Sequence, residues 1–166
     1  MSEYSLIHFN VVRPLGDFSV ETTESRYFFE QLGQLVGQAK AHDGLLWHRH
    51  GLRSSDQRTL EFYDIVSLKT CGENNPHIFT LAGWRDVNAL HSFAYRQQSH
   101  IESMKRLRHW VDRTEGPTMV MWWAPKHQRI SADMAWEKLC KLRADGPTAE
   151  AFSLLSRFIQ PAGAPE

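Results

Sequence analysis

The spacing of apolar residues alternates between strand-like and helix-like along the first half of the chain. Residues Ser5 to Val12 are rich in strand formers and end just before a proline, which indicates a first strand. Apolar residues then recur at helical spacing from Ser19 to Ala41, and a glycine follows, so we expect a long amphipathic helix. Gly44 to His50 is predicted to be a second strand that leads into a polar loop, with Thr59 to Leu68 extending this edge.

The second half of the chain repeats the order strand, helix, strand. His77 to Trp84 has the composition of a third strand, and Asp86 is placed to cap the helix that follows it. A second helical stretch places four residues on one face, namely His100, Met104, Leu107 and Val111. Thr118 to Ala124 is the last strand. The order β-α-β-β-α-β predicts an α+β, ferredoxin-like fold with a four-stranded antiparallel sheet.

A further helix and an apolar tail follow this core. Ser131 to Ala144 carries an apolar stripe at helical spacing, and Gly146-Pro147 ends it. The tail from Phe152 to Ile159 is apolar enough that we expect it to pack onto the domain. We therefore expect one domain over residues 1–166, with its core at 4–125 and a C-terminal helix and tail at 131–160.

The last strand of the core is apolar on both sides. Met119, Met121 and Trp123 point one way, while the residues between them, including Trp122, point the other. Helices on one face of the sheet would leave the other face uncovered. The pattern therefore predicts a homodimer in which a second copy covers the helix-free face.

Composition narrows the class of protein and of partner. Nineteen basic and nineteen acidic residues balance, so no broad positive field attracts nucleic acid or anionic lipid. No apolar run is long enough to span a membrane and the N-terminus does not read as a secretion signal, so we expect a cytoplasmic protein. Cys71 and Cys140 lack the spacing of a zinc or disulfide framework. A small-molecule ligand is the partner that this composition favours.

Several stretches resemble a bacterial family of unknown function in the dimeric α+β barrel superfamily, which also holds the antibiotic-biosynthesis monooxygenases. The resemblance covers nearly the whole chain and is carried by Gly44 to Trp47, Phe93 to His100, Arg108 to Trp110, Met121 to Pro125, and Gly146 to Phe152. It implies a homodimer with a pocket between each sheet and its own helices. Some superfamily members oxygenate phenolic polyketides without a cofactor, and others bind haem. Gly83-Trp84 and the His- and Arg-rich segment after Trp47 depart from the family pattern.

Four polar residues are candidates for catalysis in such a pocket. His100 shares a helical face with apolar residues and should point toward the sheet, either as a general acid-base group or as a structural lock. Tyr95 precedes it and would anchor a substrate or serve the fold. His8 and Asn10 share one face of the first strand. There His8 would act as a base and Asn10 would hold a carbonyl or a dioxygen-derived intermediate, unless both serve buried hydrogen bonding or dimer contact.

His48 and His50 share a strand face with spacing compatible with two metal ligands. No third ligand is evident, and the neighbouring Arg49, Arg53 and Arg58 favour a solvated basic edge. We therefore predict no metal site.

Six tryptophans are many for this length and suit a flat aromatic ligand as well as core packing. The residues expected to contact substrate are Trp47, Trp84, Met104, Trp110 and Trp122. The leading hypothesis is a small-molecule enzyme of secondary metabolism, a cofactor-independent oxygenase or cyclase acting on an aromatic or polyketide-like substrate. The alternatives are a non-catalytic ligand-binding or structural homodimer and a haem-dependent enzyme. No cofactor is expected in the leading reading.

Overall fold

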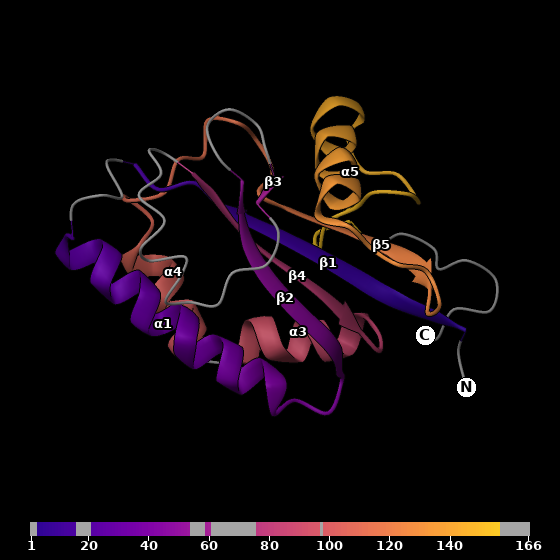
Figure 1. Cartoon of the computed structure of the whole chain (residues 1–166), viewed down its shortest axis with the longest axis horizontal. Coiled ribbons are helices and arrows are strands. Elements are labelled where there is room, and N and C mark those ends of the chain that lie inside the picture. The colour runs from indigo at the N-terminus through magenta and orange to yellow at the C-terminus, as the bar shows by residue number, and fades with distance from the viewer. Residues whose placement is uncertain (1–2, 16–20, 54–58, 61–75, 97, 157–166) are drawn as a thin grey trace.

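The computed structural model describes residues 3–15, 21–53, 59–60, 76–96 and 98–156. Their strands form one antiparallel sheet in the order β3-β2-β4-β1-β5 (Figure 1). The strands are β1 Tyr4–Val12, β2 Leu45–Arg53, β3 Thr59–Leu60, β4 His77–Trp84 and β5 Met119–Pro125. The order β2-β4-β1-β5 is that of the ferredoxin-like fold, which confirms the predicted α+β class, and β3 adds a two-residue edge. The rest of the predicted extension, residues 61–68, lies outside the described residues.

The helices are α1 Thr23–Lys40, α3 Val87–Arg96, α4 Gln98–Arg106 and α5 Ala132–Asp145. Three of them begin at side-chain caps that satisfy otherwise unpaired amide groups. Thr22 and Ser25 form a reciprocal capping box at α1. Asp86 accepts from the amide of Ala89 at 2.7 Å, as its position before α3 predicted, and Ser131 caps α5 in the same way.

Helix α4 is shorter than the apolar spacing predicted. It ends at Arg106, and the chain then tightens into turns in which the Trp110 amide donates to the Leu107 carbonyl at 2.9 Å. Val111 instead forms an isolated bridge with Pro14, at the end of β1. Leu107 and Val111 both still line the cavity described below, which explains why the helical spacing continues where the helix does not.

The two faces of the sheet are covered by different helices. Figure 1 shows α1, α3 and α4 on one side, here called the three-helix face, and α5 on the other, here called the α5 face. On the α5 face, Phe9, Leu81 and Trp122 are buried beside Leu139 and Leu142 of α5. The expectation of a helix-free face was therefore wrong, because α5 occupies it. Homodimerisation stays a prediction, and burial of the last strand no longer argues for it, since both Met121 and Trp122 are buried within one chain.

A polar cluster holds α5 against the end of the sheet. Glu115 accepts from Arg13 at 2.6 Å, from Arg143 of α5 at 3.1 Å and pairs with His77 of β4 at 3.0 Å. Beside it, Arg53 of β2 lies with its guanidinium carbon 3.7 Å from the centre of the Trp136 ring. Because these contacts join β1, β2 and β4 to one helix, they fix the position of α5 on the sheet.

The tail returns to the sheet as predicted, but only in part. Phe152 is buried, and its backbone exchanges two hydrogen bonds with Met121 of β5, at 2.7 and 2.9 Å. Leu155 is 92% exposed, so the expectation that it would be buried was wrong. Phe158 lies outside the described residues. The docked segment thus covers the otherwise open edge of β5, which is the edge a sheet must protect.

Two glycines offer a paired test of this packing. A Cβ at Gly44, where the chain enters β2, would overlap the Cβ of Ala89 on α3, whereas a Cβ at Gly37 on α1 would meet nothing. We expect Gly44→Ala to lower the free energy of unfolding by about 1–3 kcal/mol through overpacking. Gly37→Ala should raise it by about 1 kcal/mol, because alanine favours the helix. Urea unfolding measures both, and equal effects of the two variants would contradict the close contact between β2 and α3.

Candidate functional site

A cavity of about 240 Å3 lies between the three-helix face of the sheet and helices α1, α3 and α4. Its helical wall is mainly apolar and comes from Phe28, Leu32, Leu35, Val36, Ala39, Phe93, Met104 and Leu107. Its floor comes from the inward-facing residues of β1, β2 and β4 and includes His8, Asn10, His48, Thr80, Ala82 and Trp84. The helical wall is therefore mostly apolar, with Gln31, Ser103 and His100 among its residues, and the floor offers further hydrogen bonds, which is the usual character of a small-molecule site.

Strand register places the polar residues of the floor in two adjacent rows. In one row, Ala82 on β4 lies between His8 on β1 and His48 on β2. In the next row, Thr80 on β4 pairs with Asn10 on β1. The Ala82 side chain is a single methyl group, so the space above it stays open between the two imidazoles.

A bulge in β2 decides which side chains reach this floor. Leu45 pairs with Trp84 and Trp47 with Gly83, so Leu46 is an extra residue. An extra residue moves every following side chain to the opposite face. Trp47 consequently packs on the α5 face over Gly83, and His48 enters the cavity.

His100 reaches the cavity from α4. Its Nδ1 lies 3.1 Å from the Ala94 carbonyl oxygen, which can only accept, so Nδ1 carries the proton. In the neutral ring, Nε2 then carries a lone pair, and it has no hydrogen-bond partner among the described residues. Burial lowers the pKa of His100, although the hydrogen bond to Ala94 opposes that shift. His100 is thus neutral near pH 7 and has a nitrogen able to accept a proton.

His8 and His48 are also held in the neutral state. Burial, together with the neighbouring His100 and His48, lowers the pKa of His8 to about 4. Burial, with His50 and Lys40 nearby, lowers the pKa of His48 to about 4. At neutral pH each of these rings offers one N–H donor and one acceptor nitrogen rather than a charge.

Trp84 contributes a donor that lacks a partner. Its side chain is 2% exposed and lines the cavity, with the Phe93 ring centre 5.2 Å from its own. Its Nε1 is buried, and no hydrogen-bond partner for it exists among the described residues. A buried N–H without an acceptor costs about 1–3 kcal/mol. An oxygen atom of a bound ligand would remove that cost.

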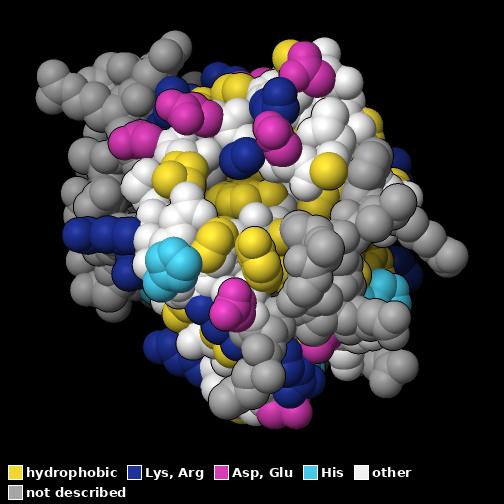
Figure 2. Space-filling view, turned by 90° about the vertical axis from the view of Figure 1, so that its right-hand side faces the viewer, with side chains coloured by type: hydrophobic (Ala, Val, Ile, Leu, Met, Phe, Trp, Pro, Cys, Tyr) yellow, Lys and Arg dark blue, Asp and Glu magenta, His cyan; other side chains and the backbone are white. Residues whose placement is uncertain are grey.

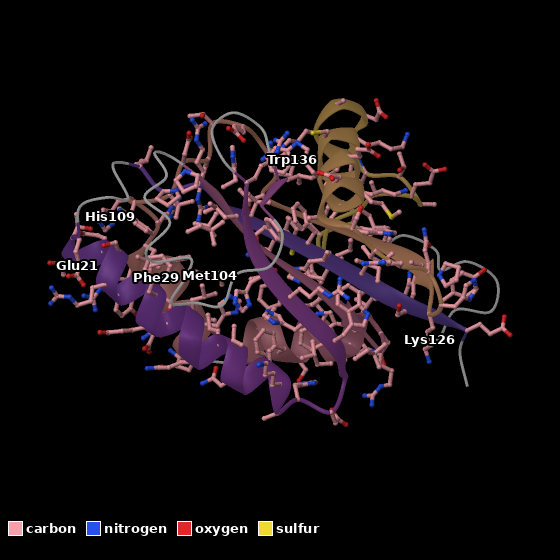
Figure 3. The ribbon with its side chains drawn as sticks, viewed as in Figure 1. Glu21, Phe29, Met104, His109, Lys126 and Trp136 are labelled. Carbon is pink, nitrogen blue, oxygen red and sulfur yellow. The ribbon has the colours of Figure 1, made fainter. Side chains whose placement is uncertain are left out.

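The structure brings together five of the nine residues named from the sequence: His8, Asn10, Trp84, His100 and Met104 line the cavity. Figure 3 shows Met104 on the three-helix side of the sheet and Trp136 on the α5 side. The other four lie elsewhere. Trp47 and Trp122 pack on the α5 face, Trp110 packs against Phe28 with ring centres 5.4 Å apart, and Tyr95 is 44% exposed beside His91.

His48, Thr80 and Ala82 are residues of the cavity that the sequence reading did not assign to it. His48 was read as part of a solvated basic edge because arginines surround it in the sequence, and no sequence signal marks the bulge at Leu46. Thr80 and Ala82 carried a signal that could have been used, since alternation along the predicted strand puts both on one face with Ile78 and Trp84. The register with β1 would then have placed Thr80 opposite Asn10.

Metal-binding clusters and membrane-spanning helices are both absent from the part of the chain that the structure describes. Within it, no group of three or more His, Cys, Asp or Glu side chains is placed to hold a metal ion. Within the same residues, no helix has the length and apolar character needed to cross a membrane. Figure 2 shows acidic and basic side chains interspersed around a hydrophobic centre on one face of the molecule.

The fold and this cavity define a ferredoxin-like α+β protein with an internal cavity between its sheet and three of its helices. Residues 6–166 match the model of a family described as a domain of unknown function, DUF3291, and the chain belongs to that family. This confirms the resemblance to a family of unknown function. A comparison by sequence with curated proteins found no match.

Solved structures with similar folds share little sequence with this chain. A variant of SnoaB, a cofactor-independent oxygenase from Streptomyces nogalater, is 10% identical, with a TM-score of 0.43 over 78% of this chain and 98% of that one. PA3566 from Pseudomonas aeruginosa is 12% identical, with a TM-score of 0.40 over 79% of this chain and 97% of that one. A second SnoaB structure is 11% identical, with a TM-score of 0.38 over 80% and 98% of the two chains.

The lowered histidine pKa values predict a loss of stability in mild acid. Between pH 6.5 and about 4, the unfolded chain binds a proton at His8 that the folded chain does not, so acidification favours unfolding. For one histidine the full loss is roughly 3 kcal/mol. We expect the free energy of unfolding to fall as the pH is lowered from 7 to 5, measured by urea titration at each pH.

Replacing His8 by a side chain that does not ionise separates this effect from other titrations. His8→Gln should flatten the pH dependence in this window, whatever it does to stability at pH 7. The exposed His127 supplies the control, because His127→Gln should keep the full dependence. An unchanged slope in His8→Gln would show that His8 is not buried in the neutral form.

Proposed function

We propose that this protein is a small-molecule enzyme that removes a proton from an aromatic or polyketide-like substrate bound between the sheet and the three helices, and that it needs no cofactor. The observation that carries the proposal is His100 in a mainly apolar cavity, with Nδ1 bound to Ala94 and with no hydrogen-bond partner for Nε2 among the described residues. Such a group accepts a proton from a substrate without requiring a metal or prosthetic group. The size of the cavity, about 240 Å3, suits a molecule of one or two fused rings.

The proposed step is a single proton transfer. His100 Nε2 takes a proton from an acidic C–H or O–H group of the substrate, which leaves an enolate or phenolate with negative charge on oxygen. The Trp84 N–H, which has no acceptor among the described residues, is available to donate to that oxygen, while the side-chain amide of Asn10, two rows of the sheet away, can bind a second polar group of the substrate. Donors held in place in a cavity with little water stabilise such charge more than water does.

Two finer activities begin with this same step. An enolate closes a ring when its carbon attacks a carbonyl group in the same molecule, and an electron-rich phenolate or enolate is the species that reacts with dioxygen. The proposal of a cofactor-independent oxygenase or cyclase therefore rests on one shared deprotonation. What supports it is the placement of base and donors, and the product depends on the substrate.

Binding without turnover is the second candidate, and a specific observation favours it. The pKa values of His8 and His48, about 4, make these two rings weak bases, well suited to hydrogen bonding and poorly suited to proton abstraction. If His100 also serves only to lock α4 to Ala94, the cavity is a binding site alone.

Hydrogen exchange on a ketone distinguishes the two candidates. 2-Tetralone has acidic protons beside its carbonyl group, and their exchange for deuterium in heavy water is followed by proton NMR. The protein should accelerate this exchange above buffer, and His100→Gln should reduce the protein-dependent rate about a hundredfold. The rate should increase with pH as the His100 imidazole loses its proton, with a midpoint below the usual 6.5.

The matched control is His109→Gln, because the His109 side chain is 70% exposed and lies outside the cavity. Circular dichroism checks that each variant is folded. Binding of 2-tetralone without any acceleration would favour the binding candidate, and an exchange rate that survives His100→Gln would remove His100 as the base. A Soret absorbance band in the purified protein would contradict the cofactor-independent reading.

A further inference from the structure

His48 was not part of the catalytic step above, yet the bulge at Leu46 sends its ring into the same cavity. It lies in one row with Ala82 and His8, so two imidazoles stand on either side of a single methyl group. Neighbouring strands are about 4.8 Å apart, which places the backbones of His8 and His48 about 10 Å from each other. The gap between them is part of the cavity floor.

The width of this gap sets the ligand that fits it. Strand side chains stand roughly perpendicular to the sheet, so the two imidazoles keep about the 10 Å spacing of their backbones. A hydrogen bond from each imidazole takes up about 2.8 Å of it. That leaves roughly 4 Å between two ligand oxygens that bind both rings at once. Two oxygens in a 1,3 relation on an aromatic ring are separated by a similar distance, whereas a ligand with one oxygen can reach only one of the two rings.

The charge of the cavity selects a neutral ligand. Among the lining residues that the structure describes, Arg113 is the one with a permanent charge, and it is exposed. Arg113 belongs to the segment between α4 and β5, where it lines the cavity with Val111 and Thr118. His8 and His48 line a different part of the cavity, in the row of the sheet next to Trp84. A charged group placed over Ala82 would lose its hydration and find no counter-ion there.

We propose that His8 and His48 form a paired hydrogen-bonding site over Ala82 that selects uncharged aromatic ligands carrying two oxygens in a 1,3 relation. The inference rests on the ligand cavity of the proposed function and not on its catalysis. Each ring donates to or accepts from one ligand oxygen, and Ala82 leaves room for the ring edge that joins them. His48 is then a specificity-determining residue, because it distinguishes the second oxygen.

Two bicyclic probes that differ by one oxygen test this site. 1,3-Dihydroxynaphthalene and 1-naphthol share a ring system and are both neutral at pH 7, and isothermal titration calorimetry under anaerobic conditions gives their affinities. The dihydroxy probe should bind the native protein about tenfold more tightly, since losing one partner leaves a buried imidazole unsatisfied. In His48→Leu the ratio of the two affinities should fall to about one, and His48→Asn should restore part of it.

Exposed His127 provides the control, because His127→Leu should leave the ratio unchanged. Equal affinities in the native protein, a ratio that persists in His48→Leu, or no binding of either probe would overturn the inference. The 2-tetralone exchange separates this result from the proposed function. Exchange without the preference overturns the paired site and leaves the catalysis standing, whereas the preference without exchange supports the paired site and removes the catalysis.

Discussion

Polar side chains at inward positions of the central strands are the constraint on which the rest of this structure depends. His8 and Asn10 on β1 face Ala82 and Thr80 on β4, on the side of the sheet that three helices cover. Apolar helix faces gain nothing by packing tightly onto such groups, because burying a polar group without a partner is unfavourable. The helices instead pack at the margins, where Leu52, Ile78 and Leu107 are buried, and a cavity remains over the polar rows.

The opposite face of the sheet is apolar at its centre, and its polar pair, Arg53 and His77, lies at one end. Ile7, Phe9 and Phe79 pack there against α5, which the Glu115 cluster holds to the ends of three strands. This packed layer supports the floor of the cavity from the other side of the sheet. The same sheet thus has one face that supplies stability and one that supplies chemistry, and the single extra residue at Leu46 assigns Trp47 to the first and His48 to the second.

The sequence predicted the fold more closely than the site, for reasons that particular residues make clear. Strand periodicity located β4 at its true ends, His77 and Trp84, and the order of elements defined the sheet. Periodicity also showed that Trp122 shares a face of the sheet with the residues two positions before and after it. It could not show which of the two faces the three helices cover, because that depends on contacts between residues distant in sequence. The sequence placed cavity residues correctly where the strand alternation or the helical spacing is regular, as for His8 on β1 and His100 on α4. It was misread after the bulge, where Trp47 and His48 exchange roles.

Nitrogen NMR of the histidine side chains shows whether the cavity holds neutral imidazoles ready to bind an uncharged ligand. Spectra recorded as the pH is lowered should show His8 and His48 remaining neutral until about pH 4. His100 should carry its proton on Nδ1 and none on Nε2 at neutral pH. Adding 1-naphthol should shift these resonances. Titration of His8 and His48 near 6.5, the ordinary value for histidine, would contradict the account.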